Sequence, residues 1–125
     1  MPIKPEDFLE LAKQLASRRD EASLRTAVNR AYYALFHNGR RIVKDFRPHW
    51  PVPTGPEVHK VLPDYLMRIG LDEQIPEFIT LANEIKKLRR RRREADYDID
   101  KRFMSQKEVI NLIRRAENVK VNIRL

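Results

Sequence analysis

Cysteine is absent from the chain, and no apolar run approaches the roughly 20 residues that a bilayer-spanning helix needs. Without cysteine the protein has no disulfide, no thiolate metal site and no cysteine nucleophile, which fits the reducing cytoplasm. No signal-peptide pattern opens the sequence, and no alternating run of β-branched residues precedes the last seven positions. The sequence therefore predicts a cytoplasmic, helical protein without a membrane span.

Acidic residues are in the minority: 18 Asp and Glu stand against 26 Lys and Arg, a formal net charge of +8. Such a balance favours a polyanionic partner, such as RNA, DNA or a nucleotide phosphate, although charge alone carries no sequence specificity. Five consecutive arginines, Arg89 to Arg93, concentrate the excess. At about 100° per helical residue the run sweeps more than a full turn, so at least one guanidinium must point inward.

Apolar residues recur at steps of three and four along nearly the whole chain, which predicts an all-α fold in one domain over residues 1–125. The first helix is predicted to begin at Pro5 and to end at Arg18 and Arg19. Its expected buried residues are Phe8, Leu11, Ala12 and Leu15. The second helix is predicted over residues 21–44 behind an Asp20 cap, with a core stripe of Leu24, Ala27, Val28, Ala31, Leu35 and Ile42.

Glycine and proline mark the interruptions of this pattern. Gly39 lies inside the second helix, where glycine costs about 1 kcal/mol relative to alanine, so we expect close approach of another backbone or a kink. Residues 45–56 carry four prolines and are predicted to form the principal long loop. A third helix is then expected with Thr54 as its cap and Pro56 as its first residue, ending at Gly70.

Two further helices complete the predicted set. The fourth begins near Pro76 and carries the arginine run. The fifth begins with a capping box of Ser105 and Glu108, and its apolar face comprises Val109, Leu112, Ile113 and Ala116. The tail over residues 119–125 alternates but is too short to assign. The sequence therefore predicts about five helices.

The apolar stripe of the fourth helix leads into the arginine run. Continued by steps of three and four, the stripe reaches Arg92; its earlier members are Phe78, Leu81, Ile85 and Leu88. A buried guanidinium needs a carboxylate partner, a groove open to water or an anionic ligand. The candidate ion-pair partners are Asp96, Asp98 and Glu84. Because a single small bundle does not easily accommodate Arg92, we also expect a homodimer with the fourth helix near its two-fold axis.

A second stripe lies beside the core face of the second helix. It comprises Thr26, Arg30, Tyr33 and His37, at steps of four, three and four. Packed against the fourth helix, this stripe would share a cleft with Arg92. The alternative interpretation is structural. Tyr33 would then be an aromatic residue at the edge of the core, Arg30 a solvated charge, and His37 a hydrogen-bonded residue where two helices pack.

These residues carry a resemblance to a known family. Residues 30–37 read RAYYALFH and residues 92–98 read RREADYD, and the chain is therefore similar to the HEPN superfamily over roughly residues 5–118. The resemblance implies an up-and-down bundle of about five helices that is usually dimeric. It also implies a prokaryotic toxin–antitoxin or defence module.

Catalytically active HEPN proteins are metal-independent ribonucleases with an arginine, four to six intervening residues and a histidine, often followed two residues later by a tyrosine. Arg90, Ala95 and Tyr97 fit that frame, except that alanine replaces the histidine. Imidazole is suited to proton transfer near neutral pH and alanine is not. We therefore expect weak or absent cleavage that Ala95→His would raise. His37 and His59 are the weaker candidates for a catalytic imidazole.

The leading hypothesis is an Arg-lined cleft that binds RNA or a nucleotide phosphate. In it Arg90, Arg92 and Arg93 hold phosphate, and Tyr97 offers its hydroxyl or stacks on a base. Arg30, Tyr33 and His37 form the opposite wall. No cofactor or metal is expected, because Asp96, Asp98 and Asp100 have arginine neighbours that oppose a cation. The alternatives are an interaction partner of a nucleotidyltransferase or toxin, whose Arg92 is merely ion-paired, and, third, an active ribonuclease.

Overall fold

The computed structural model describes residues 4–121, which contain five helices and no strand. The helices are α1 (Pro5–Ala16), α2 (Glu21–Phe46), α3 (Val58–Asp72), α4 (Pro76–Tyr97) and α5 (Gln106–Val119). The predicted all-α fold is confirmed. None of the helices in the described part is both long and apolar enough to span a bilayer. Of the predicted tail, residues 122–125 lie outside the described range.

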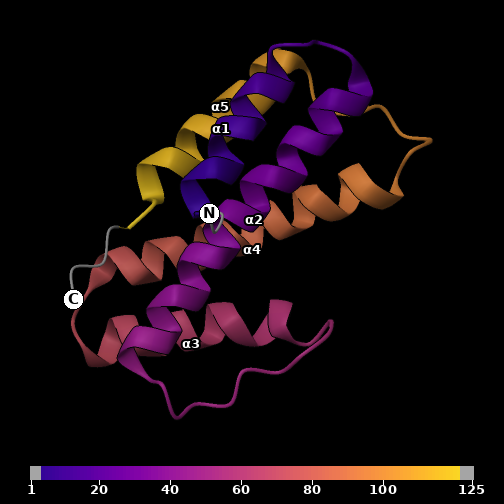
Figure 1. The fold of residues 1–125 in the computed structure, drawn as a ribbon. Helices are drawn as coiled ribbons and strands as arrows, with labels where there is room; N and C mark the ends of the chain where they lie inside the picture. The colour runs from indigo at the N-terminus through magenta and orange to yellow at the C-terminus, as the bar shows by residue number, and fades with distance from the viewer. Residues whose placement is uncertain (1–3, 122–125) are drawn as a thin grey trace.

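The long α2 helix is the centre of the bundle and packs against each of the other four helices. Figure 1 shows α1 and α5 along one part of α2, and α3 and α4 along the other. The chain reverses direction between α1 and α2 and again between α3 and α4 (Figure 1). This arrangement places the arginine run of α4 beside the middle of α2.

Two of the predicted helix starts have the expected hydrogen bonds. The Asp20 carboxylate accepts from the Ser23 backbone N–H at 2.9 Å. In the capping box of α5, the Ser105 hydroxyl accepts from the Glu108 backbone N–H at 3.2 Å, and the Glu108 carboxylate accepts from the Ser105 backbone N–H at 3.1 Å. Both predictions are confirmed, and each satisfies N–H groups that the first turn of a helix leaves unpaired.

The predicted bounds of the third helix were wrong at both ends. A short turn, with Val58 N–H bonded to the Gly55 carbonyl at 3.3 Å, occupies the segment where Thr54 and Pro56 were expected to start the helix. Gly55 has a φ of 82°, a left-handed conformation suited to glycine. The helix passes through Gly70 and ends at Asp72.

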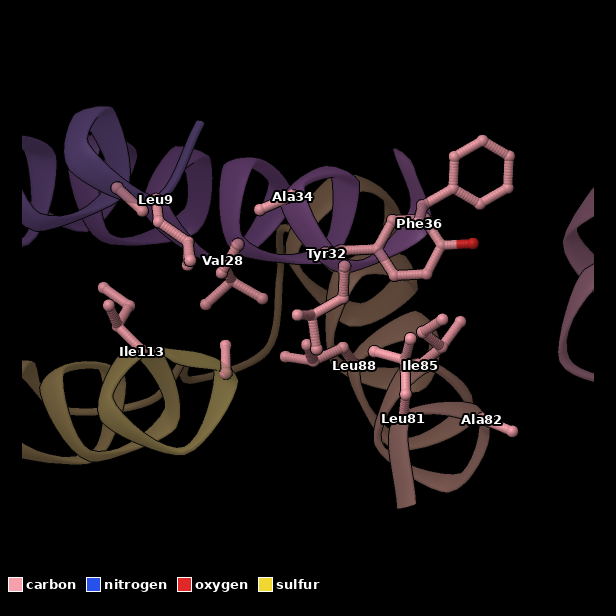
Figure 2. Packing of buried hydrophobic residues seen from close by; sticks show 14 of the residues in the cluster. Leu9, Val28, Tyr32, Ala34, Phe36, Leu81, Ala82, Ile85, Leu88 and Ile113 are labelled. Atoms are coloured by element: carbon pink, nitrogen blue, oxygen red, sulfur yellow. The ribbon is translucent and has the colours of Figure 1, made fainter. Parts of the chain in front are cut away.

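The core follows one face of α2 and has two parts along its length (Figure 2). In one part, Leu9 of α1, Val28 of α2 and Ile113 of α5 meet. In the other, the buried ring of Tyr32 lies over α4, whose core residues are Leu81, Ile85 and Leu88. The expected inner face of α1 was partly wrong. Ala12 is buried as expected, but Leu11 is 41% exposed, and the other buried residues of α1 are Leu9 and Ala16.

Gly39 marks the predicted close approach, although side chains rather than a backbone come near it. A Cβ atom added at Gly39 would lie 2.8 Å from Leu66 Cδ1 and 3.2 Å from Ile85 Cδ1. The missing side chain therefore lets α3 and α4 pack onto α2. At Gly70, by contrast, an added Cβ would lie 3.0 Å from the Ile75 carbonyl oxygen and 2.8 Å from the Ile79 side chain.

We expect Gly70→Ala to destabilise the protein more than Gly39→Ala. At Gly39 the nearest atoms are the ends of flexible side chains, and alanine gains about 1 kcal/mol of helix propensity, so the net change should stay within about 1 kcal/mol. At Gly70 a backbone oxygen must move, which typically costs about 1–3 kcal/mol. Urea denaturation of both variants measures the difference. Equal destabilisation would show that the two sites relax equally well.

Candidate nucleic-acid interface

The side chains of the arginine run point in different directions around the last turns of α4. Arg90, Arg91 and Arg93 are exposed, whereas Arg89 and Arg92 are half-buried. Only 14% of the Arg92 side chain is exposed. The run therefore divides between an outer surface and a junction where α4 faces α2 and α3.

Arg92 finds its partners within a single chain. Its Nη1 donates to the Tyr33 hydroxyl at 3.3 Å and lies 3.6 Å from the Asp96 carboxylate. The guanidinium carbon also lies 5.2 Å and 5.7 Å from the ring centroids of Tyr32 and Tyr33. These interactions offset part of the cost of desolvating the cation. The expectation that one bundle does not easily accommodate Arg92 was therefore wrong, and a dimer is not needed to explain its burial.

Of the three carboxylates considered for Arg92, the structure selects Asp96. Glu84 is buried and pairs instead with Arg115 of α5 at 3.1 Å. The Asp98 carboxylate lies 3.9 Å from Lys101. Glu84 and Asp98 were thus wrong as partners of Arg92, because Glu84 pairs with a cation of α5 and Asp98 with one three residues further along the chain.

Tyr32 and His59 form a hydrogen-bonded pair beside Arg92. The Tyr32 hydroxyl lies 2.6 Å from His59 Nδ1, linking α2 to the start of α3. Burial raises the pKa of the Tyr32 hydroxyl to about 12, although Arg92 and Arg89 oppose the shift. Burial, followed by the charges of Arg92 and Arg89, lowers the pKa of His59 below its ordinary value. At neutral pH the pair is therefore uncharged.

The predicted stripe of Thr26, Arg30, Tyr33 and His37 does not form one wall. Among these four, Tyr33 is the residue that contacts Arg92 in the described part of the chain. The Arg30 guanidinium lies 5.8 Å from the Phe8 ring centroid, and the His37 ring stacks on the same ring at 5.4 Å. The Thr26 hydroxyl donates to the Ala22 carbonyl of its own helix at 2.8 Å. Arg30 and His37 thus belong to the contact between α1 and α2.

The outer face of α4 carries a basic groove of about 470 Å³, lined by Lys86, Arg89, Arg90, Arg93, Glu94, Tyr97 and Asp98. Tyr97 is 72% exposed. Within residues 4–121 no ion pair involves Arg89, Arg90 or Arg93. The two carboxylates pair elsewhere, Glu94 with Arg91 at 3.1 Å and Asp98 with Lys101 at 3.9 Å. The structure thus groups Arg90, Arg93 and Tyr97, and it separates them from Arg92.

Ala95 occupies a place where a histidine would not meet Arg90. Ala95 is only 4% exposed and belongs to the core. Five helical steps separate it from Arg90, which places the two side chains about 140° apart around the helix. An imidazole at position 95 would enter the core, which argues against the expectation that Ala95→His raises cleavage; that expectation stays a prediction.

Arg25 was not predicted as a functional or structural site, yet it has an extensive set of partners. Its side chain is 10% exposed, its Nε lies 3.4 Å from the Glu21 carboxylate, and its guanidinium lies 4.7 Å from the Phe103 ring centroid. It donates to four backbone carbonyls, those of Glu94 at 3.1 Å, Ala95 at 2.9 Å, Asp98 at 3.1 Å and Lys101 at 3.0 Å. The carbonyls of Glu94 and Asp98 also accept backbone N–H groups, whereas for those of Ala95 and Lys101 Arg25 is the donor found within the described residues. Arg25 precedes the core residues Val28 and Tyr32 by three and seven positions, and this helical spacing could have indicated that its side chain is buried.

Stability should fall as the pH drops below about 7, because both half-buried histidines oppose protonation. The folded-state pKa values of His37 and His59 lie below the ordinary 6.5. As the pH falls through this range, the unfolded chain binds more protons than the folded one. The two histidines therefore contribute their full stabilisation above pH 6.5, and this contribution decreases as the pH falls from 6.5 to the folded-state pKa values. Glu6, Asp20 and Glu108 also have lowered pKa values, but their ordinary values of 4.5, 3.8 and 4.5 confine their effect to more acidic solutions.

Thermal unfolding between pH 8 and pH 5 measures this dependence. His59→Gln should flatten the slope near pH 6 relative to the wild type, and His49→Gln, at an exposed loop position, serves as the control. An unchanged slope in His59→Gln would contradict the assignment.

Among known proteins, the chain is similar to the uncharacterized protein MJ0992 of Methanocaldococcus jannaschii, with 32% identity over 107 residues. The match takes in 76% of this chain and 60% of that protein, so the chain spans about three fifths of the relative's length. No family model and no solved structure matches the chain.

Proposed function

We propose that the protein binds RNA or a nucleotide phosphate through the outer face of α4. The observation that carries the proposal is the basic groove, in which Lys86, Arg89, Arg90 and Arg93 surround the exposed ring of Tyr97. Guanidinium groups bind phosphate oxygens in a bidentate fashion, and an exposed aromatic ring stacks on unpaired bases. A single strand presents both chemical groups along its length.

The charge balance of the groove supports the same proposal. Its four cations face two carboxylates that already have partners at Arg91 and Lys101. Within the described residues the guanidinium groups of Arg90 and Arg93 have no ion pair, so an incoming phosphate would meet them without first displacing a carboxylate. Phosphate binding of this kind releases counterions from the nucleic acid and so weakens with added salt.

We further propose that the protein is HEPN-like and works in a cytoplasmic toxin–antitoxin or defence module with weak or absent ribonuclease activity. The two segments that carry the resemblance, residues 30–37 and 92–98, meet through the contact of Tyr33 with Arg92, which supports a shared role. Among the described residues no histidine lines the basic groove, and Ala95 is buried. The groove thus offers binding groups for phosphate but no imidazole for proton transfer.

Replacing Arg90 and Arg93 with alanine should weaken binding to single-stranded RNA by about tenfold or more. If each arginine binds one phosphate, the slope of log affinity against log salt should fall by about 0.7 for each arginine removed. Fluorescence anisotropy with a labelled oligonucleotide across a salt series measures both quantities.

The matched control removes two exposed cations of α5, in the variant Lys107→Ala with Arg114→Ala. This variant has the same net charge as the double arginine variant and should keep the salt slope of the wild type. Equal weakening in the two double variants would indicate diffuse attraction and contradict binding at the groove. No RNA binding by the wild type near physiological salt would refute the proposed function.

A second candidate function is a protein-interaction module, either as a homodimer or in a complex with a nucleotidyltransferase encoded nearby. The observation that favours it is an apolar pair at the end of α4, where Tyr97 is 72% and Ile99 is 70% exposed. Light scattering at micromolar concentration tests the homodimer. A dimer that Ile99→Asp dissociates, and that persists at high salt, would support this function, whereas a monomer mass would count against it.

A further inference from the structure

A second cluster of hydrogen-bond donors lies where α2, α3 and α4 meet. Tyr32 comes from α2, His59 from the start of α3, and Arg89 and Arg92 from α4. Tyr32 is fully buried, whereas the other three residues are half-buried. The His59 ring also lies 5.0 Å from the Phe36 ring. Aromatic rings therefore fix the position of this imidazole on one side, and the charges of the two arginines reach it from α4.

The Tyr32 hydroxyl determines which nitrogen of His59 carries the proton. The hydroxyl keeps its proton at neutral pH, because its pKa is about 12. Its only hydrogen-bond partner within residues 4–121 is His59 Nδ1, at 2.6 Å. If Nδ1 donated that bond, the buried hydroxyl proton would have no acceptor, which typically costs about 1–3 kcal/mol. The Tyr32 hydroxyl therefore donates to Nδ1, and neutral His59 carries its proton on Nε2.

We propose that His59 Nε2–H and Arg92 form a binding site for one phosphate group, the terminal phosphate of an RNA or nucleotide, with Arg89 between this site and the outer groove that it also lines. All three residues present donors only, which matches the acceptor-only oxygens of phosphate. The Nε atoms of Arg89 and Arg92 are buried and have no hydrogen-bond partner in the described part of the chain. Because only 14% of the Arg92 side chain is exposed, the site favours the end of a strand over a continuous one.

Asp96 is the carboxylate that opposes an anion at this cluster. It lies 3.6 Å from Arg92 and accepts from the Asn29 amide at 3.3 Å. Two guanidinium groups and one carboxylate leave the cluster with a net positive charge. The Asn29 hydrogen bond gives Asp96 a second partner, so Arg92 can turn to a phosphate without leaving this carboxylate unbonded.

The identity of the ligand at this site rests on the proposed function. The site gives His59 the role of a hydrogen-bond donor to phosphate. A histidine whose free nitrogen carries the proton does not act as a general base in its neutral form. We therefore place His59 among the phosphate-binding residues and not among catalytic residues.

The tautomer is tested by nitrogen NMR of the full chain labelled at histidine, with the three histidine signals assigned from His→Gln variants. At pH 7.5 the wild type should show His59 protonated at Nε2 and unprotonated at Nδ1. Inorganic phosphate, titrated against chloride at equal ionic strength, should shift the His59 Nε2 signal saturably. Protonation at Nδ1, or no saturable shift, would overturn the proposal.

Three variants separate a binding role from a structural one. Tyr32→Phe keeps the ring but removes the hydroxyl, and it should weaken phosphate binding about fivefold, the value of about one hydrogen bond. His59→Gln retains an N–H donor and should keep more affinity than His59→Leu. Equal affinities for those two would contradict donation by His59.

The Arg90→Ala, Arg93→Ala variant distinguishes failure of the phosphate site from failure of the proposed function. It should lose RNA affinity and retain the phosphate-induced shift of His59. If RNA binds through the outer groove but phosphate does not shift His59, only the phosphate site is refuted. If phosphate shifts His59 but no RNA binds, the RNA-binding function fails and the phosphate site remains.

Discussion

Replacing Arg25 with methionine is expected to lower the free energy of unfolding by about 2–5 kcal/mol, because each backbone carbonyl left without a donor costs about 1–3 kcal/mol. Methionine fills the aliphatic volume but removes four hydrogen bonds, and it leaves the carbonyls of Ala95 and Lys101 without a donor, while those of Glu94 and Asp98 keep a backbone N–H. The carbonyls of Glu94 and Lys101 mark the ends of the segment that the guanidinium holds. An effect of this size is a large fraction of the roughly 5–15 kcal/mol that stabilises a typical domain.

Urea denaturation followed by circular dichroism measures the effect. Arg25→Lys keeps the charge but lacks the forked geometry that reaches several carbonyls at once, so it should fall between methionine and the wild type. Arg18→Ala, at an exposed position, is the control and should change stability by less than about 0.5 kcal/mol. Destabilisation below about 1 kcal/mol for Arg25→Met would show that water replaces the guanidinium.

Introducing histidine at Ala95 is expected to lower the free energy of unfolding by about 3 kcal/mol and to create no ribonuclease, because overpacking and an unpartnered polar ring both act against the fold. Overpacking a core typically costs about 1–3 kcal/mol, and burying an unpartnered polar group adds a similar amount. Ala95 is 4% exposed, so an imidazole at this position would have to be accommodated within the core. The wild type should likewise show little cleavage.

Calorimetry and a fluorogenic RNA substrate, assayed with chelator present, measure the two outcomes. Ala22→His places the same residue on the exposed face of α2 and should leave stability nearly unchanged. A stably folded Ala95→His variant that cleaves RNA would show that this end of α4 can turn its side chains outward.

Much of the fold followed from helical periodicity and capping residues, because both are local properties of the chain. The starts of α2 and α5 depend on Asp20 and Ser105, which act within a few residues. The inner face of α1 was harder to predict, because Leu11 and Leu9 both belong to apolar stripes. Which stripe is buried depends on where α2 and α5 lie, and periodicity does not contain that information.

The candidate site was predictable where helical geometry decided it. The core stripe of α4 pointed to Arg92, and Asp96 lies one turn further along the same helix. Interactions between distant segments left no such signal. The pair of Tyr32 and His59 joins residues 27 positions apart, and Arg25 reaches carbonyls 69 to 76 positions away. Neither contact produces a periodic pattern that could be recognised in a single sequence.

The hydrogen bonds from Arg25 to the end of α4 should also affect how tightly the outer groove binds a ligand. Tyr97 lies between Ala95 and Asp98, whose carbonyls are both bonded to Arg25. The backbone under this exposed ring is therefore already ordered before any ligand arrives. A base that stacks on Tyr97 need not immobilise a loose helix end, so the entropy lost on binding is smaller. The same residue that stabilises the fold thus preorganises the edge of the groove.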